Sequence, residues 1–150
     1  SYSLYQDMNG LLISKKEKKL LFYPFEKKEK ILSIPDGIEI IAAEAVSNRI
    51  HLEEVILPDS LHIIESKAFY GCRNLKHINL PENLKRIESS AFHSCSSLLS
   101  ILLPDKLNVI DYSVFYACSS LESVKLPSAL RIIAPCAFSG CGSLSEIVFP

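Results

Sequence analysis

The chain repeats one arrangement of apolar and polar residues every 23 positions. Four copies keep leucine, isoleucine and phenylalanine at matching places, and each copy opens with a proline. The copies cover residues 58–80, 81–103, 104–126 and 127–149, and a degenerate copy precedes them at 35–57. A fixed period of this length is typical of stacked solenoids, in which each repeat buries its apolar face against its neighbours. We therefore predict a solenoid of five coils over residues 35–150.

The end of each copy has the pattern of a short β-strand. Apolar residues recur as Leu75, Ile78 and Leu80 and at the equivalent places in later copies. Alternation over the last residues indicates that every second side chain is buried, and stacked copies of such a strand form a parallel sheet. The proline that follows lacks an N–H group, so we expect it to end the strand at the same place in every coil.

The middle of each copy pairs a small residue with phenylalanine, as in Ala91-Phe92. We expect the ring to fill the centre of a narrow coil while the small neighbour lets the backbone close around it. The residues before the pair, such as Glu65-Ser66, suit the start of a one-turn helix, and irregular coil is the alternative. An apolar strip beside them indicates a second, minor sheet. The strip contains Ile40, Ile63, Val109 and Ile132 and is interrupted by Arg86.

Residues 1–34 do not follow the repeat and predict a β-meander. Asn9-Gly10 lies between candidate strands and is a strong hairpin signal, because both residues tolerate positive φ. The expected strands are residues 1–7, 11–14, 20–23 and 31–34. The end of a solenoid exposes its apolar cross-section, so we expect this segment to be a β-cap on the first copy. Val46 and Arg49 replace the phenylalanine and cysteine of later copies, which fits a repeat that packs against a cap.

Four of the five cysteines share one repeat position, at Cys72, Cys95, Cys118 and Cys141. Residues one repeat apart in a solenoid lie about 4.8 Å apart, so these thiols should form a ladder in which cysteine acts as a small hydrophobe. The spacing also permits disulfides between neighbours, although parallel side chains disfavour them. A metal ladder is disfavoured because zinc ligands must converge on one point. The fifth, Cys136, is expected to be an exposed or half-exposed free thiol.

Composition and charge exclude several classes of function. The 150 residues are 48% hydrophobic and 22% charged, which is ordinary for a folded domain, and the formal net charge is −1. A net charge this close to zero gives no excess of basic residues to bind the phosphates of nucleic acid, and no apolar run is long enough to insert in a membrane. Catalysis needs unlike groups that converge on one point, whereas a solenoid spreads like groups along a line. We therefore expect no enzyme activity, no cofactor and no metal site.

The frame L-x-x-I-x-L-P-x-x-L-x-x-I-x-x-x-A-F-x-x-C resembles the BspA-like, or Treponema-type, leucine-rich repeats and covers residues 35–150. The resemblance implies a right-handed α/β leucine-rich repeat solenoid with a parallel sheet on one face. It also implies a surface-exposed or secreted protein that adheres to host or neighbouring-cell proteins, with no catalytic residues. The family often has glycine after the second isoleucine, so the geometry of that corner is open here. The residues at that corner are Glu65, Glu88, Asp111 and Ala134.

Binding in leucine-rich repeats usually uses strand residues that point away from the core, which here are the positions that the copies do not preserve. The first row is Glu54, His77, Ser100, Ser123 and Glu146. The second row is Ile56, Asn79, Leu102, Lys125 and Val148. The apolar members of the second row either form an exposed interaction surface or are half-buried by their neighbours or by the unseen remainder of the protein. A second candidate surface, Tyr70, His93 and Tyr116, lies on the convex side and either anchors a partner or shields the phenylalanines.

These observations favour a protein-binding or adhesion module, cell-surface or secreted, with an extracellular-matrix or host surface protein as its partner. One alternative is a structural spacer without a dedicated partner. Another is an intracellular scaffold, which free thiols permit. Pro150 opens a copy that is not completed. We therefore expect the natural protein to continue, or this end to be covered by another chain, as in end-to-end association of otherwise monomeric chains.

Overall fold

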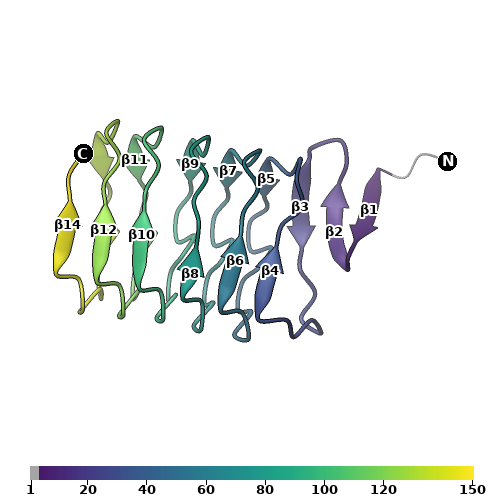
Figure 1. Cartoon of the computed structure of the whole chain (residues 1–150), viewed down its shortest axis with the longest axis horizontal. Coiled ribbons are helices and arrows are strands. Elements are labelled where there is room, and N and C mark those ends of the chain that lie inside the picture. The colour runs from purple at the N-terminus through teal and green to yellow at the C-terminus, as the bar shows by residue number, and fades with distance from the viewer. Residues whose placement is uncertain (1–3) are drawn as a thin grey trace.

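Each 23-residue copy folds into one flattened coil with a short strand on either side, and the coils stack in chain order (Figure 1). The computed structural model describes residues 4–150. The N-terminal strands are β1 (Tyr5–Met8), β2 (Leu11–Ser14), β3 (Lys19–Phe22) and β4 (Ile31–Ser33). One side of the stack continues with β6 (Glu54–Ile56), β8 (His77–Ile78), β10 (Ser100–Leu102), β12 (Ser123–Lys125) and β14 (Glu146–Val148). The other side has β5 (Ile40–Ile41), β7 (Ile63–Ile64), β9 (Arg86–Ile87), β11 (Val109–Ile110) and β13 (Ile132–Ile133).

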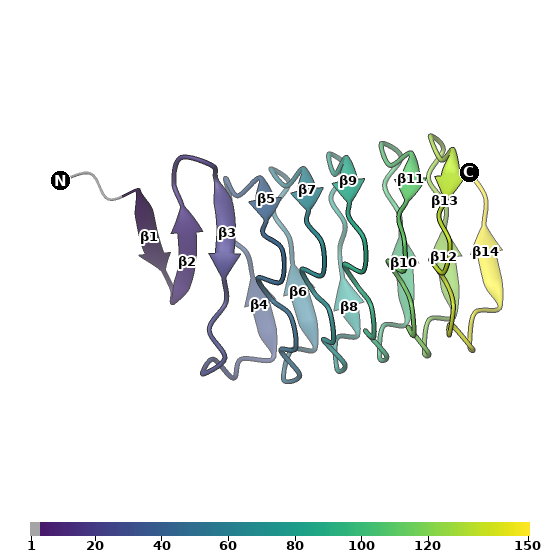
Figure 2. The same ribbon diagram turned by 180° about the vertical axis from the view of Figure 1, so that it is seen from behind.

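Parallel pairing between successive coils builds sheets on both sides (Figure 2). The front sheets have the orders β4-β6-β8 and β10-β12-β14. The rear sheets have the orders β1-β2-β3-β5-β7-β9 and β11-β13. Residues one repeat apart pair directly, as Ile63 does with Arg86. The parallel sheet and the second sheet are therefore both confirmed. Arg86 lies in β9 of the second sheet, so it interrupts the apolar strip but not the strand pairing with β7.

The N-terminal segment begins as a meander and then joins the stack. The β1–β2 hairpin is confirmed, with Asn9 and Gly10 at φ values of 53° and 80°. Residues 1–3 of the expected first strand lie outside the described residues. Strand β3 is antiparallel to β2 but parallel to β5, and β4 leaves the meander to pair in parallel with β6. Residues as early as Lys19 thus continue the sheets, and the division of the chain at residue 34 stays a prediction.

The expected one-turn helices are absent from residues 4–150, where the segments before the phenylalanines are turns instead. In each copy one residue of this turn adopts a left-handed conformation, which an α-helix does not accommodate. These residues are Lys67, Ser90, Ser113 and Cys136, with φ of 58°, 58°, 54° and 62°. The alternative of irregular coil was right, and the fold is a β-solenoid rather than an α/β one. Its right-handed sense stays a prediction.

Carboxylates stabilise the corner at which the family often has glycine. The backbone N–H of Ser66 donates to Glu88 Oε2 at 3.1 Å, and that of Ala43 donates to Glu65 Oε1 at 3.3 Å. Each carboxylate thus bonds the backbone of the preceding coil. The position of the left-handed residue, two places after the corner, explains why the corner itself tolerates a side chain.

Two side-chain ladders run through the core. The rings of Phe69, Phe92, Phe115 and Phe138 stack face to face, with centroid separations of 5.4, 5.7 and 5.5 Å. The thiols of Cys72, Cys95, Cys118 and Cys141 each donate to a backbone carbonyl 26 residues earlier, at 3.0 to 3.2 Å. All five cysteines are free, as expected, and Cys136 is exposed. Burial raises the pKa of the Cys72 and Cys118 thiols to about 12.

Arg49 closes the thiol ladder at its N-terminal end and is 1% exposed. Its Nε donates to the Tyr23 carbonyl at 2.8 Å, its Nη2 donates to the same oxygen, and its Nη1 donates to the Ser47 carbonyl. The guanidinium lies over the Phe25 ring, 3.5 Å from the centroid. The first repeat therefore departs from the others because it packs against the N-terminal segment, as the sequence predicted.

Candidate partner-binding surface

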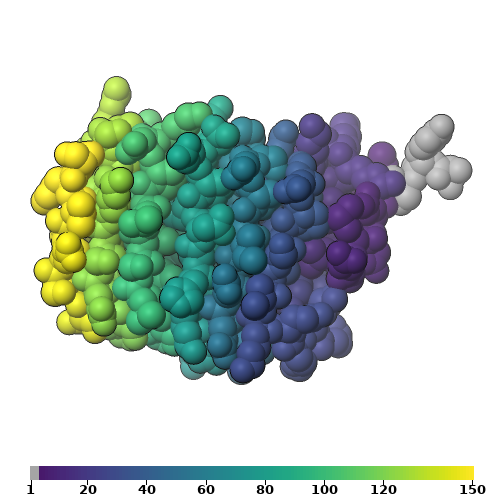
Figure 3. All heavy atoms as spheres, in the orientation of Figure 1, coloured from purple at the N-terminus to yellow at the C-terminus, as the bar shows by residue number. Residues whose placement is uncertain are grey.

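The two predicted rows lie on the outer side of the front sheets. We call this side, which faces the viewer in Figure 3, the front face. Strand pairing places neighbouring members side by side: Glu54 pairs with His77, and Ser100 pairs with Ser123. In the second row, Lys125 pairs with both Leu102 and Val148. The strands thus bring the predicted residues together on one surface, except that Asn79 follows β8 rather than lying within it.

The apolar members of the second row are exposed. The exposed fractions of Ile56, Leu102 and Val148 are 43%, 69% and 38%. Val55 and Ile101, the strand neighbours of Ile56 and Leu102, are buried because alternate side chains point inward. Ile147, the strand neighbour of Val148 in the last coil, is 48% exposed. Neighbouring side chains of this chain therefore leave the three residues exposed.

Strand β4 extends the front face by two residues that the sequence analysis missed. Ile31 pairs with Glu54 and Ser33 pairs with Ile56, so they begin the first and second rows. Ile31 is 54% exposed. The 23-residue spacing from Ile31 to Glu54 was the available signal, but the irregular sequence between them concealed it.

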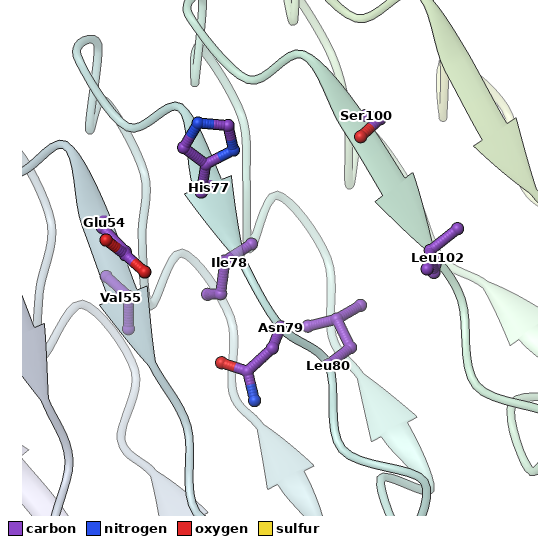
Figure 4. Close-up of a pocket in the computed structure, with 8 residues that line it drawn as sticks. All are labelled: Glu54, Val55, His77, Ile78, Asn79, Leu80, Ser100 and Leu102. Carbon is purple, nitrogen blue, oxygen red and sulfur yellow. The ribbon is translucent and has the colours of Figure 1, made fainter.

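Two shallow depressions lie on the front face on either side of Leu102. The first, of about 350 Å³, is lined by Glu54, Val55, His77, Ile78, Asn79, Leu80, Ser100 and Leu102 (Figure 4). The second, of about 470 Å³, is lined by Leu80, Glu82, Leu102, Leu103, Pro104, Asp105, Lys106 and Lys125. Both combine exposed leucine with carboxylate, amide or ammonium groups, which is a lining suited to a polypeptide ligand.

A row of charges borders the front face where the chain enters β4, β6 and β8. Glu53 Oε1 lies 3.4 Å from Lys30 Nζ, and Glu53 Oε2 lies 3.5 Å from Lys76 Nζ. The two ammonium groups lower the pKa of the Glu53 carboxyl. These groups are solvent-exposed, so they contribute little to stability and are available to orient a charged partner.

The convex row forms a stack of rings. Tyr70 and Tyr116 flank His93 with centroid separations of 4.6 Å on each side. Burial lowers the pKa of His93, and nearby Lys67 lowers it further. Because the rings cover one another's faces, this row presents mainly ring edges, and it is a weaker anchor surface than the front face.

Potential metal ligands do not converge in the part of the chain that the structure describes. Among residues 4–150, no three His, Cys, Asp or Glu side chains gather as metal ligands. The same residues include no helix long and apolar enough to cross a bilayer. What the arrangement supplies is an extended surface of variable side chains on a stiff frame.

Comparison with known proteins places this frame among bacterial repeat proteins. The model of the BspA type leucine-rich repeat region matches residues 18–150 with six copies. A leucine-rich cell surface protein from Faecalibacterium prausnitzii is 29% identical with a TM-score of 0.90, over 98% of this chain and 40% of that protein. A leucine-rich repeat protein of T. pallidum is 30% identical with a TM-score of 0.83, over 96% of this chain and 68% of that one.

The pneumococcal vaccine antigen PcpA shares the fold, with a TM-score of 0.83 at 24% identity over 97% of this chain and 36% of that protein. The chain thus spans less than half the length of two of these three proteins. A search of curated proteins finds no match. The six copies begin at residue 18, close to the start of β3, in agreement with the pairing of β3 and β4 to the repeats.

Proposed function

The chain belongs to the BspA-type leucine-rich repeat family, and from that premise we propose that it binds a partner protein through the front face. Leucine-rich repeats are in general non-enzymatic scaffolds for protein interaction. The observation that carries the proposal is the exposure of Ile56, Leu102 and Val148 at outward strand positions of one surface. Exposed apolar residues rimmed by polar groups mark interaction surfaces.

The mechanism is rigid display. Each coil contributes two outward side chains whose spacing is set by strand pairing, so the surface needs little ordering when it binds. The apolar residues supply contact area, while Glu54, Lys125 and Glu146 set the orientation of the partner. Affinity then depends on shape and area rather than on chemistry at one point.

The proposed place of action is the cell surface or the extracellular space. A structural relative is described as a cell surface protein and another as a vaccine antigen. The proposed ligand is an extracellular-matrix or host surface protein. Fibronectin, laminin and collagen are suitable probes for this class of ligand.

The test is a front-face variant that combines Ile56→Ser, Leu102→Ser and Lys125→Ser. Binding to immobilised fibronectin, laminin and collagen is measured, and the variant is expected to bind at least about tenfold more weakly, because it loses the apolar contact area. The matched control combines Tyr70→Ser and Tyr116→Ser on the convex side. Loss of binding in the control alone would move the site there, and no binding by the unaltered protein would favour the spacer function.

A further inference from the structure

Both sides of the solenoid are interrupted at the same step between coils. The front sheets end at β8 and resume at β10, and the rear sheets end at β9 and resume at β11 (Figures 1 and 2). We call this boundary the seam. At the other steps along the stack, strands of successive coils pair. The seam is therefore a local feature of the front and rear sheets.

Backbone hydrogen bonds show what is lost at the seam. In the preceding step, the amides of Lys76 and His77 donate to the Glu53 carbonyl at 2.8 and 3.2 Å. The equivalent amides across the seam belong to Leu99 and Ser100, and among the described residues neither donates to a carbonyl. An amide without a partner in a strand edge is an available donor, and leaving it unpaired costs about 1–3 kcal/mol where water is excluded.

The seam is held together away from the strands. The amides of Phe92 and Ser94 donate to the carbonyls of Val114 and Tyr116 at 3.0 and 2.7 Å. Lys106 Nζ also donates to Asn83 Oδ1 at 2.8 Å. The convex turns therefore stay joined while the strands on both sides are unpaired.

Asn79 supplies a local cause for the interruption. Its Oδ1 accepts from the Leu57 amide at 3.0 Å, and its Nδ2 donates to the Leu57 carbonyl at 3.2 Å. Elsewhere the first of these bonds is made by a main-chain carbonyl, as when the Leu103 amide donates to the Lys125 carbonyl at 3.1 Å. The side chain of Asn79 thus takes the place of its own backbone, and β8 ends after two residues.

Core side chains become accessible at the seam. Ile78 and Leu80 are only half-buried, whereas their equivalents Ile101 and Leu103 are 2% and 3% exposed. The two depressions on the front face lie here and share Leu80 and Leu102 (Figure 4). The seam therefore offers unpaired strand amides and apolar side chains in one place.

We propose that the seam is a slot for an extended segment of the partner protein, which adds as a strand beside β10 and packs an apolar side chain between Leu80 and Leu102. An extended peptide presents carbonyls at strand spacing, which the Leu99 and Ser100 amides require, and its alternate side chains point to the apolar depressions. A small rigid ligand or a helix would leave those amides unpaired. This inference rests on the proposed function, because it specifies the part of the partner that the front face binds.

The state of the seam is tested first, by hydrogen exchange of individual amides. The Leu99 and Ser100 amides should exchange roughly 100-fold faster than those of Lys76 and His77. Asn79→Val removes the side-chain bonds to Leu57 and should slow the Leu99 and Ser100 amides by a similar factor, because β8 and β10 then pair. Asn74→Val is the matched control. It removes a side-chain bond from the same coil to the preceding one, at the Ile50 carbonyl, but lies outside both rows and both depressions, so it should leave them fast. Equal exchange in both pairs of amides of the unaltered protein would overturn the proposal.

The ligand is tested with a phage library of random linear seven-residue peptides selected on the unaltered protein. Enriched peptides should slow exchange of the Leu99 and Ser100 amides, bind Asn79→Val at least tenfold more weakly than Asn74→Val, and lose binding when their backbone amides are methylated. A library that yields no such peptide overturns the proposal. In the matrix-protein assay, binding that the front-face variant loses and Asn79→Val keeps would refute the slot alone. Binding that the front-face variant keeps would refute the proposed function.

Discussion

The first repeat and the interior coils place different residues at the same repeat position, and in both cases the side chain donates to a backbone carbonyl. Interior coils place cysteine at the position where the first repeat places Arg49, and all of these side chains donate to a backbone carbonyl 26 residues earlier. For Arg49 that carbonyl belongs to Tyr23, and for Cys95 it belongs to Phe69. The repeat position therefore holds a buried donor whose length matches the distance to the carbonyl of the preceding coil.

The neighbouring coil decides which donor fits. Between two full coils the space is small, and a thiol fills it while remaining within 3.2 Å of its acceptor. At the first repeat the preceding turn is aromatic, and the longer guanidinium reaches the Tyr23 and Ser47 carbonyls while it packs on Phe25. Burial lowers the pKa of Arg49. Carbonyls and rings stabilise its charge, and none of the salt bridges among residues 4–150 involves it.

The largest effect on stability is expected in the adjacent ladder of phenylalanine rings. This ladder has phenylalanine in the interior coils and valine in the first repeat. Phe92 is fully buried and stacks on Phe69 and Phe115, so Phe92→Ala should lower the free energy of unfolding by about 4 kcal/mol through the cavity it leaves. Val46 occupies the same row in the first repeat, and Val46→Ala should cost about 2 kcal/mol. Urea unfolding followed by circular dichroism measures both. A loss below about 1 kcal/mol for Phe92→Ala would show that the ring is not in the core.

The next largest effect is expected when the Arg49 donor is replaced by the cysteine of the interior coils. Arg49→Cys places the interior residue at the end, where the thiol leaves the Ser47 carbonyl and the face of Phe25 without a partner. We expect a loss of about 3 kcal/mol, from an unsatisfied buried acceptor and a cavity together. Arg73→Cys, in an exposed position of the next coil, is the control and should change stability by less than about 0.5 kcal/mol. Equal stability of the two variants would mean that any donor suffices at the first repeat.

These ladders show what the sequence could predict. The burial of Phe92 and Cys95 follows from letters that recur in every copy, so the core and the strand rows were correctly expected. The sequence analysis placed Tyr23 in a strand of the cap but did not predict that it continues the repeat. Tyr23 lies 23 residues before Val46, and its amide makes the equivalent backbone bond, to the Ala45 carbonyl at 3.0 Å. The pairing of Leu20 with Ile41 has an offset of 21 rather than 23. Two residues are therefore missing from this corner, and the periodic frame does not extend through it.

The seam could not be predicted for a different reason. On the front side it coincides with a single outward residue, Asn79, whose side-chain amide bonds back to the Leu57 backbone. Its place in the repeat predicted that the Asn79 side chain points outward. Whether that side chain then bonds to solvent or to the backbone depends on local geometry, which the repeat pattern does not reveal. The one-turn helices failed for a similar reason, since the left-handed residues Lys67 and Ser90 have no glycine to signal them.

The smallest expected effect is a pH dependence of stability that comes from the buried Cys118 thiol. Burial raises the pKa of Cys118 from 9.0 to about 12, so the folded protein holds this proton more firmly than the unfolded chain does. The stability that this difference contributes is complete below pH 9 and is lost as the pH rises toward 12. Cys118→Ala should cost roughly 1 kcal/mol at pH 7, through the bond to the Phe92 carbonyl. That cost should shrink above pH 9, because only the unaltered protein loses the contribution of the thiol.

Ser119→Ala is the control, and urea unfolding at pH 7 and pH 10 measures both variants. A cost for Cys118→Ala that is the same at both pH values would show that the thiol is not buried as the ladder requires.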